Sequence, residues 1–479
     1  MIITALANWN PPAGTVLEWH PAGAAPAGEA DPGRASFLQE NHVRGVAAGQ
    51  LAGREHHAYL ATATEVKGEL DAAAMSRAVE RFTRRHEGLR TWLEVANGAV
   101  TRWRVPADAV AFEARELGAT AGGAAFRGYA LERFSREAIV TAYPGFVVGA
   151  VRRPGSFTLY YGCDHALSDG VSQALVLPEL LELYRAEATG AALGPFTSIP
   201  AGGFPEYAAA EHALAAEFGP ESPEIAEWLE IVERNNGELP TCPVELGLAP
   251  GETAPMRPIE FDLLDADGTA AFDAVCKDEG VRFIAGVLAA VAVADLEIAG
   301  EPDYYGMIVT STRDRGDYLL SQGWFCNFAP VAFPVRSAGT FRALLAQAHA
   351  GYERALRLAA APVQSVITAL LMAGADPAKV AASPNMLSYI DFRRFPGAGT
   401  PEYEHGLLFT GEGATGNASL WINRDRRHLY LGCQSPGTPA AQAALAPYHA
   451  RLREVFAEVA RDGDRAICPR EVIGAGHHR

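Results

Sequence analysis

One short segment carries most of the chemistry that the sequence offers. Residues 156–163 form an apolar run, which Asp164 and His165 follow, and Asp169 comes four positions after the histidine. Rigid backbone holds a histidine at the end of a strand, and an imidazole titrates near neutral pH, so His165 is a candidate general base. Gly170 follows where the chain turns into a helix, and the conformational freedom of glycine would permit a tight turn there.

Other interpretations of this segment stay open. A lone histidine is more often a hydrogen-bonded core residue than a catalytic one. Cys163 precedes His165 by two positions, and on a strand both side chains would face the same side. A Cys–His nucleophile pair is therefore an alternative to a small buried cysteine. The H-x-x-x-D-G spacing alone does not decide among these interpretations.

Alternating helices and strands must position these side chains. Asp71 is a candidate N-cap of a helix with apolar residues at helical spacing. The second half repeats the order Leu-Asp, helix, Glu-Gly at 264–280, which hints that the two halves share a supersecondary plan. Strands are expected at 57–66, 99–104, 145–152, 156–163, 257–263, 304–312, 386–392, 418–423 and 428–433, and helices after Asp71 and Asp265 and over 171–186, 283–295 and 439–461.

Three motifs in a fixed order resemble the condensation-domain superfamily. They are GELDAAAMSRAVERFTRRHEGLRTW at 68–92, HALSDG at 165–170 and TSTRDRGDYLLSQGWFCNF at 310–328. The resemblance extends over about residues 36–460. Within the superfamily the chain looks most like the stand-alone polyketide-associated acyltransferases of actinobacteria, a likeness carried by NWNPPAGTVLEWHPAG near the N-terminus and by SYIDFRRFPG at 388–397.

This resemblance implies a fold and a domain organisation. The fold would be α/β, with two chloramphenicol-acetyltransferase-like lobes that form a V-shaped pseudo-dimer around a central tunnel. We expect an N-terminal lobe over 1–190, which carries the HxxxDG motif, and a C-terminal lobe over 200–479. The small residues of 187–204 are the best candidate for a linker.

The resemblance also implies roles for individual residues. The catalytic motif would be His165, Asp169 and Gly170: the histidine would deprotonate the acceptor, and the Gly170 amide would stand near the developing oxyanion. Asp169 would pair with Arg313 and hold the turn without moving protons. Peptide-synthetase condensation domains usually carry two adjacent histidines, and the first is here Asp164, which we expect to support the site. Candidate acceptor or tunnel contacts are Asn327, Ser388, Asp391 and Trp421.

We therefore expect a cytoplasmic acyltransferase of secondary metabolism, in lipid or polyketide biosynthesis. It would move an acyl group, other than an aminoacyl group, from an acyl-coenzyme A or phosphopantetheinyl carrier thioester to a hydroxyl of a sugar, polyketide or other small molecule. No cofactor would be permanently bound, and an acyl carrier protein is a candidate partner. Two alternatives remain: a free-standing amide-forming condensation enzyme of peptide natural-product biosynthesis, and a non-catalytic binding module that kept the fold.

Composition excludes several other classes. The chain has 479 residues, 49% of them apolar and 20% charged, which is typical of a globular protein with a large core. Its net charge of −17 repels phosphate backbones, so nucleic-acid binding is not expected. Six scattered cysteines indicate reduced thiols, and no zinc-binding motif predicts a metal. The longest apolar run, 283–294, is too short to span a bilayer, so no stable membrane insertion is expected. One chain with both lobes could act as a monomer.

Overall fold

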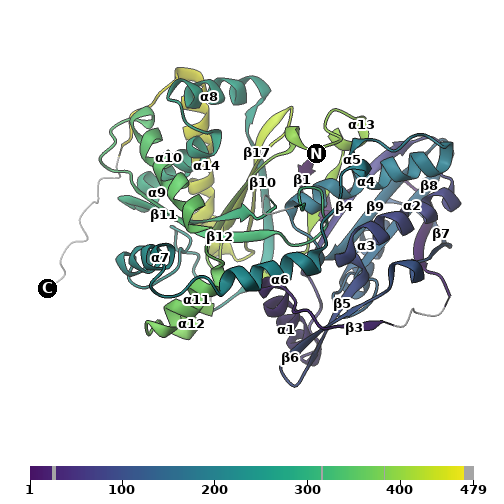
Figure 1. Cartoon of the computed structure of the whole chain (residues 1–479). Coiled ribbons are helices and arrows are strands. Elements are labelled where there is room, and N and C mark those ends of the chain that lie inside the picture. Colours follow the sequence, from purple (N-terminus) through teal and green to yellow (C-terminus); the bar gives the residue numbers. More distant parts are fainter. Residues whose placement is uncertain (24–27, 314–316, 382, 469–479) are drawn as a thin grey trace. The chain divides into compact units, whose positions relative to one another are not determined.

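The computed structural model describes residues 1–23, 28–313, 317–381 and 383–468, and the chain divides into two units (Figure 1). The first unit comprises residues 1–214, 311–326 and 392–413, and the second comprises 215–310, 327–391 and 414–479. Two segments of the C-terminal half therefore belong to the unit that carries the HxxxDG motif, a feature that the sequence did not predict. The lobe boundaries at 190 and 200, the V shape and the central tunnel stay predictions.

A seven-stranded mixed sheet forms the middle of the first unit. Its strands in spatial order are β1 (Ile2–Ile3), β14 (Leu407–Thr410), β4 (Tyr59–Lys67), β9 (Ser156–Asp164), β8 (Phe146–Arg153), β2 (Gly14–Pro21) and β7 (Phe112–Thr120). β9 pairs antiparallel with both β4 and β8, so it lies inside the sheet.

Helices cover both faces of this sheet, as the alternation of side chains along β9 requires. Leu159 and Tyr161 pack in one core with α2 (Ala72–Arg85) and α4 (Gly170–Thr189). Tyr160 packs in a second core with α3 (Gly123–Glu137). Because β9 is covered on both faces, the segment that follows it starts from a rigid position.

Short polar signals set the helix ends of the first unit. The Asp71 side chain accepts hydrogen bonds from the backbone N–H groups of Ala73 and Ala74, so α2 begins where the sequence predicts. α4 ends at Gly190, which has a φ of 71° that favours glycine. The other elements are α1 (Phe37–Leu51), α5 (Pro195–Ser198), α6 (Phe204–Ala215), α13 (Pro401–Glu404), the strands β3 (Glu29–Asp31), β5 (Thr91–Ala96) and β6 (Ala99–Arg104), and the 3₁₀ turns η1 (Leu6–Asn8), η2 (Glu87–Arg90), η3 (Ala107–Ala109), η4 (His165–Leu167) and η5 (Phe392–Arg394).

The second unit is also built on a seven-stranded sheet. Its strands in spatial order are β12 (Cys326–Pro334), β11 (Asp303–Ser311), β13 (Met386–Asp391), β16 (Ser419–Arg424), β17 (His428–Pro436), β10 (Ala254–Asp265) and β15 (Ala414–Thr415). The predicted apolar helix is α9 (Phe283–Ala299), and nearly all of its side chains are buried. The remaining helices are α7 (Pro223–Arg234), α8 (Ala266–Asp278), α10 (Phe341–Leu358), α11 (Val363–Met372), α12 (Pro377–Ala381) and α14 (Pro439–Asp462).

The predicted elements are present, and their ends differ from the prediction by a few residues. The expected strand 99–104 is β6 residue for residue, and the helix expected at 439–461 is α14. The candidate linker 187–204 is not a plain connection, because it contains the end of α4, all of α5 and the start of α6. Elements that the sequence did not predict include α1, α3, α10, β2 and β12.

Two expectations from composition concern membranes and thiols. Within the described part of the chain, no single helix combines the length and apolar character that a bilayer span requires. The pair α10 and α11 meets the length and composition criteria only when taken together, and it is bent by 87°. All six cysteines are free, as expected.

Candidate active site

The connection between β9 and α4 carries the predicted motif. β9 ends at Asp164, His165 opens the η4 turn, and Asp169 is the N-cap of α4. His165 therefore lies beyond the strand, and the alternation that would place it on one face with Cys163 does not apply. Gly170 is the first residue of α4, and its φ is not positive, so the turn into the helix does not use the backbone conformation that only glycine adopts readily.

The His165 imidazole is held by packing rather than by hydrogen bonds. Its ring lies against the indole of Trp324, with ring centroids 4.2 Å apart and an interplanar angle of 43°. Nδ1 is buried without a hydrogen-bond partner among the described residues. Burial is the main reason why the pKa of His165 lies below its ordinary value, and the charge of His42 lowers this pKa further, against the opposing effects of Asp164 and Asp169. The ring is therefore neutral at neutral pH, as a general base must be.

Asp169 is buried and its carboxylate is fully used by its neighbours. Oδ1 accepts hydrogen bonds from the Ser172 backbone N–H at 2.7 Å and from Nη2 of Arg313 at 2.8 Å. Oδ2 accepts from the Phe325 backbone N–H at 2.9 Å and from the same Nη2 at 3.0 Å. The predicted Asp169–Arg313 pair is thus present, 3% and 4% exposed, and neither oxygen is left to accept a substrate proton.

Arg313 and Ser172 fasten the 311–326 segment to the start of α4. Nη1 of Arg313 donates to two backbone carbonyls of its own segment, at residues 318 and 321, and the guanidinium lies over the Phe325 ring. The Ser172 hydroxyl donates to the Gly323 carbonyl at 2.8 Å and accepts from the Gly323 N–H at 3.1 Å. A Cβ at Gly323 would lie 2.1 Å from the Phe204 ring, so only glycine fits there. Trp324 is consequently fixed beside His165.

A buried histidine adds a second connection between the same segments. The side chain of His86 is fully buried, and its Nε2 lies 2.9 Å from the Glu179 carboxylate of α4. Its Nδ1 accepts a hydrogen bond from the Gln322 backbone N–H at 3.3 Å. His86 therefore holds α2, α4 and the 311–326 segment together, which agrees with the structural role that the resemblance implies.

Asp164 is surrounded by groups that sequence reasoning missed. It is completely buried, and its two oxygens accept hydrogen bonds from the backbone N–H groups of Val140 and Ala166, both at 2.8 Å. Nε2 of His42 lies 2.7 Å from Oδ1, and Nε2 of His56 lies 3.4 Å from Oδ2. Burial opposes ionisation of this carboxyl, but the neighbouring His42 and His56 and the backbone donor at Ala166 outweigh it and lower its pKa. The only sequence signal was the presence of two histidines between residues 42 and 56.

Cys163 is a core residue in this structure. Its side chain is 1% exposed and packs among the apolar residues between the sheet and α4. Burial raises the pKa of the Cys163 thiol to about 12, although hydrogen bonds with Ser168 and Tyr161 act in the opposite direction. A neutral thiol is a poor nucleophile, so the Cys–His alternative loses its support.

The remaining predicted contacts belong to the second unit. The Asn327 amide donates to the carbonyls of Ala359 and Ala361, both at 2.8 Å, and accepts from the Val363 N–H at 3.0 Å. These bonds explain Asn327 as a residue that anchors the start of α11. Ser388 and Asp391 lie on β13, where Ser388 pairs in register with Trp421 on β16. The Ser388 hydroxyl is buried without a hydrogen-bond partner among the described residues.

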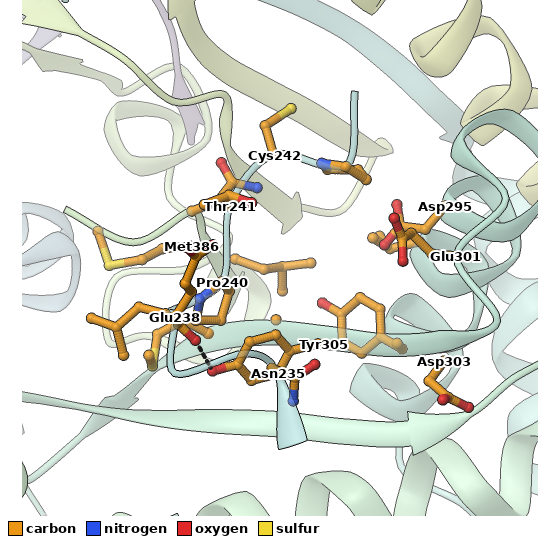
Figure 2. A pocket seen from close by; sticks show the side chains of 18 of the residues that line it. Asn235, Glu238, Pro240, Thr241, Cys242, Asp295, Glu301, Asp303, Tyr305 and Met386 are labelled. Carbon is orange, nitrogen blue, oxygen red and sulfur yellow. Dashed lines mark hydrogen bonds between the residues drawn. The ribbon is translucent and has the colours of Figure 1, made fainter. Parts of the chain in front are cut away.

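Two neighbouring cavities lie at one end of the second sheet. One, of 690 Å³, is lined by Trp421 together with residues of the segment 241–253. The other, of 380 Å³, contains none of the predicted site residues, and Figure 2 shows the acidic side chains of Asp295 and Glu301 among its lining groups. Trp421 thus lines a cavity of the second unit, and its role as an acceptor or tunnel contact stays a prediction.

A comparison with known proteins explains the agreement between motif and geometry. A sequence profile described as "Condensation domain" matches residues 38–376. The chain belongs to the condensation-domain family. This condensation-domain protein is 25% identical to acyltransferase PapA3 of Mycobacterium tuberculosis over 97% of its own length and 98% of that relative. It is 25% identical to trehalose-2-sulfate acyltransferase PapA2 of Mycobacterium bovis, with the same two coverages.

Solved structures share its fold. The structure titled PapA2 acyl transferase superposes with a TM-score of 0.85 at 21% identity, over 96% of this chain and all of that chain. The first condensation domain of the calcium-dependent antibiotic synthetase superposes with a TM-score of 0.68 at 20% identity, over 90% and 97%. The predicted α/β, chloramphenicol-acetyltransferase-like fold is confirmed. The predicted enzyme class is confirmed as well: this condensation-domain protein is an acyltransferase of a kind found in lipid biosynthesis.

No metal centre was expected in this condensation-domain protein. Within the residues that the structure describes, no three His, Cys, Asp or Glu side chains are grouped so that they could hold a metal ion. The histidines near Asp164 are arranged around a carboxylate that backbone donors already occupy.

Proposed function

We propose that this acyltransferase moves an acyl group from a coenzyme A or phosphopantetheinyl carrier thioester to a hydroxyl of a small molecule, with His165 as general base. The observation that carries the proposal is the neutral His165 imidazole, fixed against Trp324 at the end of β9. It stands beside a carboxylate, Asp169, that Arg313 has already engaged. The histidine is thus the group of the motif that is left to exchange a proton.

The chemistry needs one base and no covalent enzyme intermediate. His165 takes the proton of the acceptor hydroxyl while its oxygen attacks the thioester carbonyl, which forms a C–O bond and a tetrahedral oxyanion. The oxyanion collapses, the C–S bond breaks, and the thiolate that leaves takes the proton from the imidazolium. Ester and thiol are the products, and His165 is neutral again.

Gly170 supplies a donor for the oxyanion in this proposal. As the first residue of α4 it has a backbone N–H without an acceptor inside the helix, and the N-terminus of a helix favours negative charge. Because the Asp169 carboxylate at this end is engaged by Arg313, it does not cancel that preference. The amide and the base then act from opposite ends of the same short connection.

A sugar hydroxyl is the acceptor that we propose first. Two relatives are named as a trehalose-2-sulfate acyltransferase and a 2'-acyl-2-O-sulfo-trehalose (hydroxy)phthioceranyltransferase, and both names describe acylation of a sugar derivative. The same base would serve an amine, so the amide-forming alternative is an outcome of the test. We keep the cytoplasm as the expected compartment, because scattered free cysteines are typical of it.

The test incubates wild-type protein and His165→Ala with acyl-coenzyme A and acyl-carrier thioesters of graded length. Trehalose, trehalose-2-sulfate, simple polyols and amines serve as acceptors, and mass spectrometry measures thioester consumed and adduct formed. We expect His165→Ala to lose about 10²–10⁴-fold of the transfer rate. The matched control is Cys163→Ala, which we expect to transfer at the wild-type rate because its thiol is a packing group.

The products separate the candidate functions. An ester adduct that depends on His165 supports the proposal, and its mass identifies both acyl length and acceptor. An amide adduct would replace it with the condensation alternative. Transfer by His165→Ala at the wild-type rate would show that another group is the base. Folded protein that binds thioesters without turnover on any acceptor would favour the binding module.

A further inference from the structure

His42 and His56 approach the same buried carboxylate from different positions. His42 lies on α1, and its Nε2 is 2.7 Å from Oδ1 of Asp164, with 11% of the His42 side chain exposed. His56, from the segment before β4, is farther away at 3.4 Å from Oδ2. Among the described residues, neither Nε2 atom has a hydrogen-bond partner.

The two histidines differ in their distance from Asp164 and in their surroundings. Burial lowers the pKa of His56, and the repulsion of His42 and His57 adds to this effect, so Asp164 does not keep His56 charged. His42 is the nearer of the two to the carboxylate, at a distance that suits an ion pair when the imidazole carries a proton. The geometry therefore gives Asp164 one close imidazole neighbour, which α1 supplies.

Trp324 connects this ion pair to the proposed base. Its indole meets the His42 ring edge-on, with centroids 5.9 Å apart and an interplanar angle of 85°. The same indole lies against His165 at 4.2 Å. An imidazolium at His42 and a second one at His165 would be like charges in one buried cluster, which is unfavourable.

The other charged or titratable groups near His42 and His165 do not provide a cation beside Asp164. Arg313 is engaged by Asp169 and by backbone carbonyls. The Cys163 thiol from β9 is neutral because burial raises its pKa. His57, from the segment before β4, has 35% of its side chain exposed and lies 3.8 Å from Glu55.

We propose that His42 is a positioning residue for the reaction, whose charge, held by Asp164, keeps the His165 base in its neutral form. In this sequence Asp164 occupies the place directly before the base, and α1 brings an imidazole to it from more than a hundred residues earlier. The inference rests on the proposed role of His165. It adds a partner that the HxxxDG motif does not contain.

The test is a histidine-labelled NMR titration of the full chain, which needs no substrate. The His165 signal is assigned with His165→Gln, and its titration midpoint is measured in wild type, His42→Gln and His42→Lys. We expect the neutral His42→Gln to raise the His165 midpoint by about one pH unit. We expect His42→Lys, which retains the charge, to keep the midpoint near the wild-type value. The matched control is His57→Gln, for which we expect no change.

Each result bears on the proposal. An unchanged or lower His165 midpoint in His42→Gln overturns it, and so does a midpoint raised equally in His42→Lys, since shape and not charge would then matter. If His42→Gln does not fold, the wild-type His42 signal, assigned with His42→Lys, decides: a neutral His42 over the pH range in which His165 is neutral refutes the proposal. The transfer assay with His165→Ala tests the base separately, so the two ideas can fail independently.

Discussion

The β9–α4 and β17–α14 connections occupy equivalent places in the two units. β9 lies between β8 and β4 as antiparallel neighbours, and β17 lies in the same way between β16 and β10. α2 follows β4 and packs on α4, and α8 follows β10 and packs on α14. The first connection spans residues 165–169, whereas the second is only 437–438.

The difference in length shows which of the two equivalent connections carries the proposed catalytic residues. The short connection holds Thr438, whose hydroxyl accepts from the Ala441 N–H and caps α14, and no charged partner of this hydroxyl is found in the described part of the chain. The long connection holds a turn with His165 and a carboxylate cap, Asp169. This carboxylate is buried, and its charge is balanced there by Arg313. The shared arrangement of strands and helices stabilises both units. The longer connection and the Asp169–Arg313 ion pair belong to the first unit.

The largest expected effect on stability comes from breaking that ion pair. Arg313→Ala leaves the Asp169 charge buried without a cation, and we expect a loss of about 3–5 kcal/mol in the free energy of unfolding. Thr438→Ala, at the equivalent cap, removes one hydrogen bond and should cost about 1 kcal/mol. Urea unfolding monitored by circular dichroism measures both. Equal losses would mean that the two caps are physically alike and that the comparison has no basis in charge.

A buried carboxylate that lacks a cation should lower the stability of the folded protein when it is ionised. Asp295 on α9 accepts a 2.8 Å hydrogen bond from the Tyr448 hydroxyl, and no ion pair to it is found among the described residues. Burial raises its pKa to about 7. Between about pH 4 and pH 7 the unfolded chain therefore loses this proton while the folded protein keeps it, and stability falls as the pH rises through this range.

Asp295→Asn removes this penalty and keeps the acceptor for Tyr448. We expect the variant to be more stable than wild type above pH 7, by on the order of 4 kcal/mol, and to match it near pH 4. Urea unfolding at several pH values follows the difference. The control is Asp303→Asn. Asp303 is exposed and lines the same 380 Å³ cavity as Asp295, and its substitution should change the free energy of unfolding little. A constant difference across the pH range would contradict the explanation.

The smallest expected effects compare the two repeated helix starts directly. Asp71 caps α2 and Asp265 caps α8, and each accepts a backbone hydrogen bond within the first turn. We expect Asp71→Ala and Asp265→Ala to cost about 1 kcal/mol each, because each helix loses the side chain that caps its N-terminus. Hydrogen exchange of the two helices, read by mass spectrometry, would localise each loss to its own unit. A much larger loss at one site would reveal a role beyond capping.

The sequence predicted best those elements that depend on interactions between residues close together in the chain. Asp71 and the apolar spacing behind it predicted α2, and the run after Phe283 predicted α9, because both depend on residues within a few turns. The strand that ends at Asp164 was predicted from its apolar residues. These residues did not show that His165 would lie in the turn after the strand. α1 was missed, and with it His42, because this helix has only three buried side chains and little amphipathic signal.

The sequence by itself determined the local units and the order of the motifs, since caps, apolar periodicity and turn residues act between near neighbours. It also indicated that Asp169 needs a cation. The resemblance of the motifs pointed to Arg313 as that cation, and only the tertiary structure decided that Trp324 lies beside His165 and that α1 supplies His42. These contacts join residues more than a hundred positions apart, and their existence depends on how a sheet brings its helices and loops together.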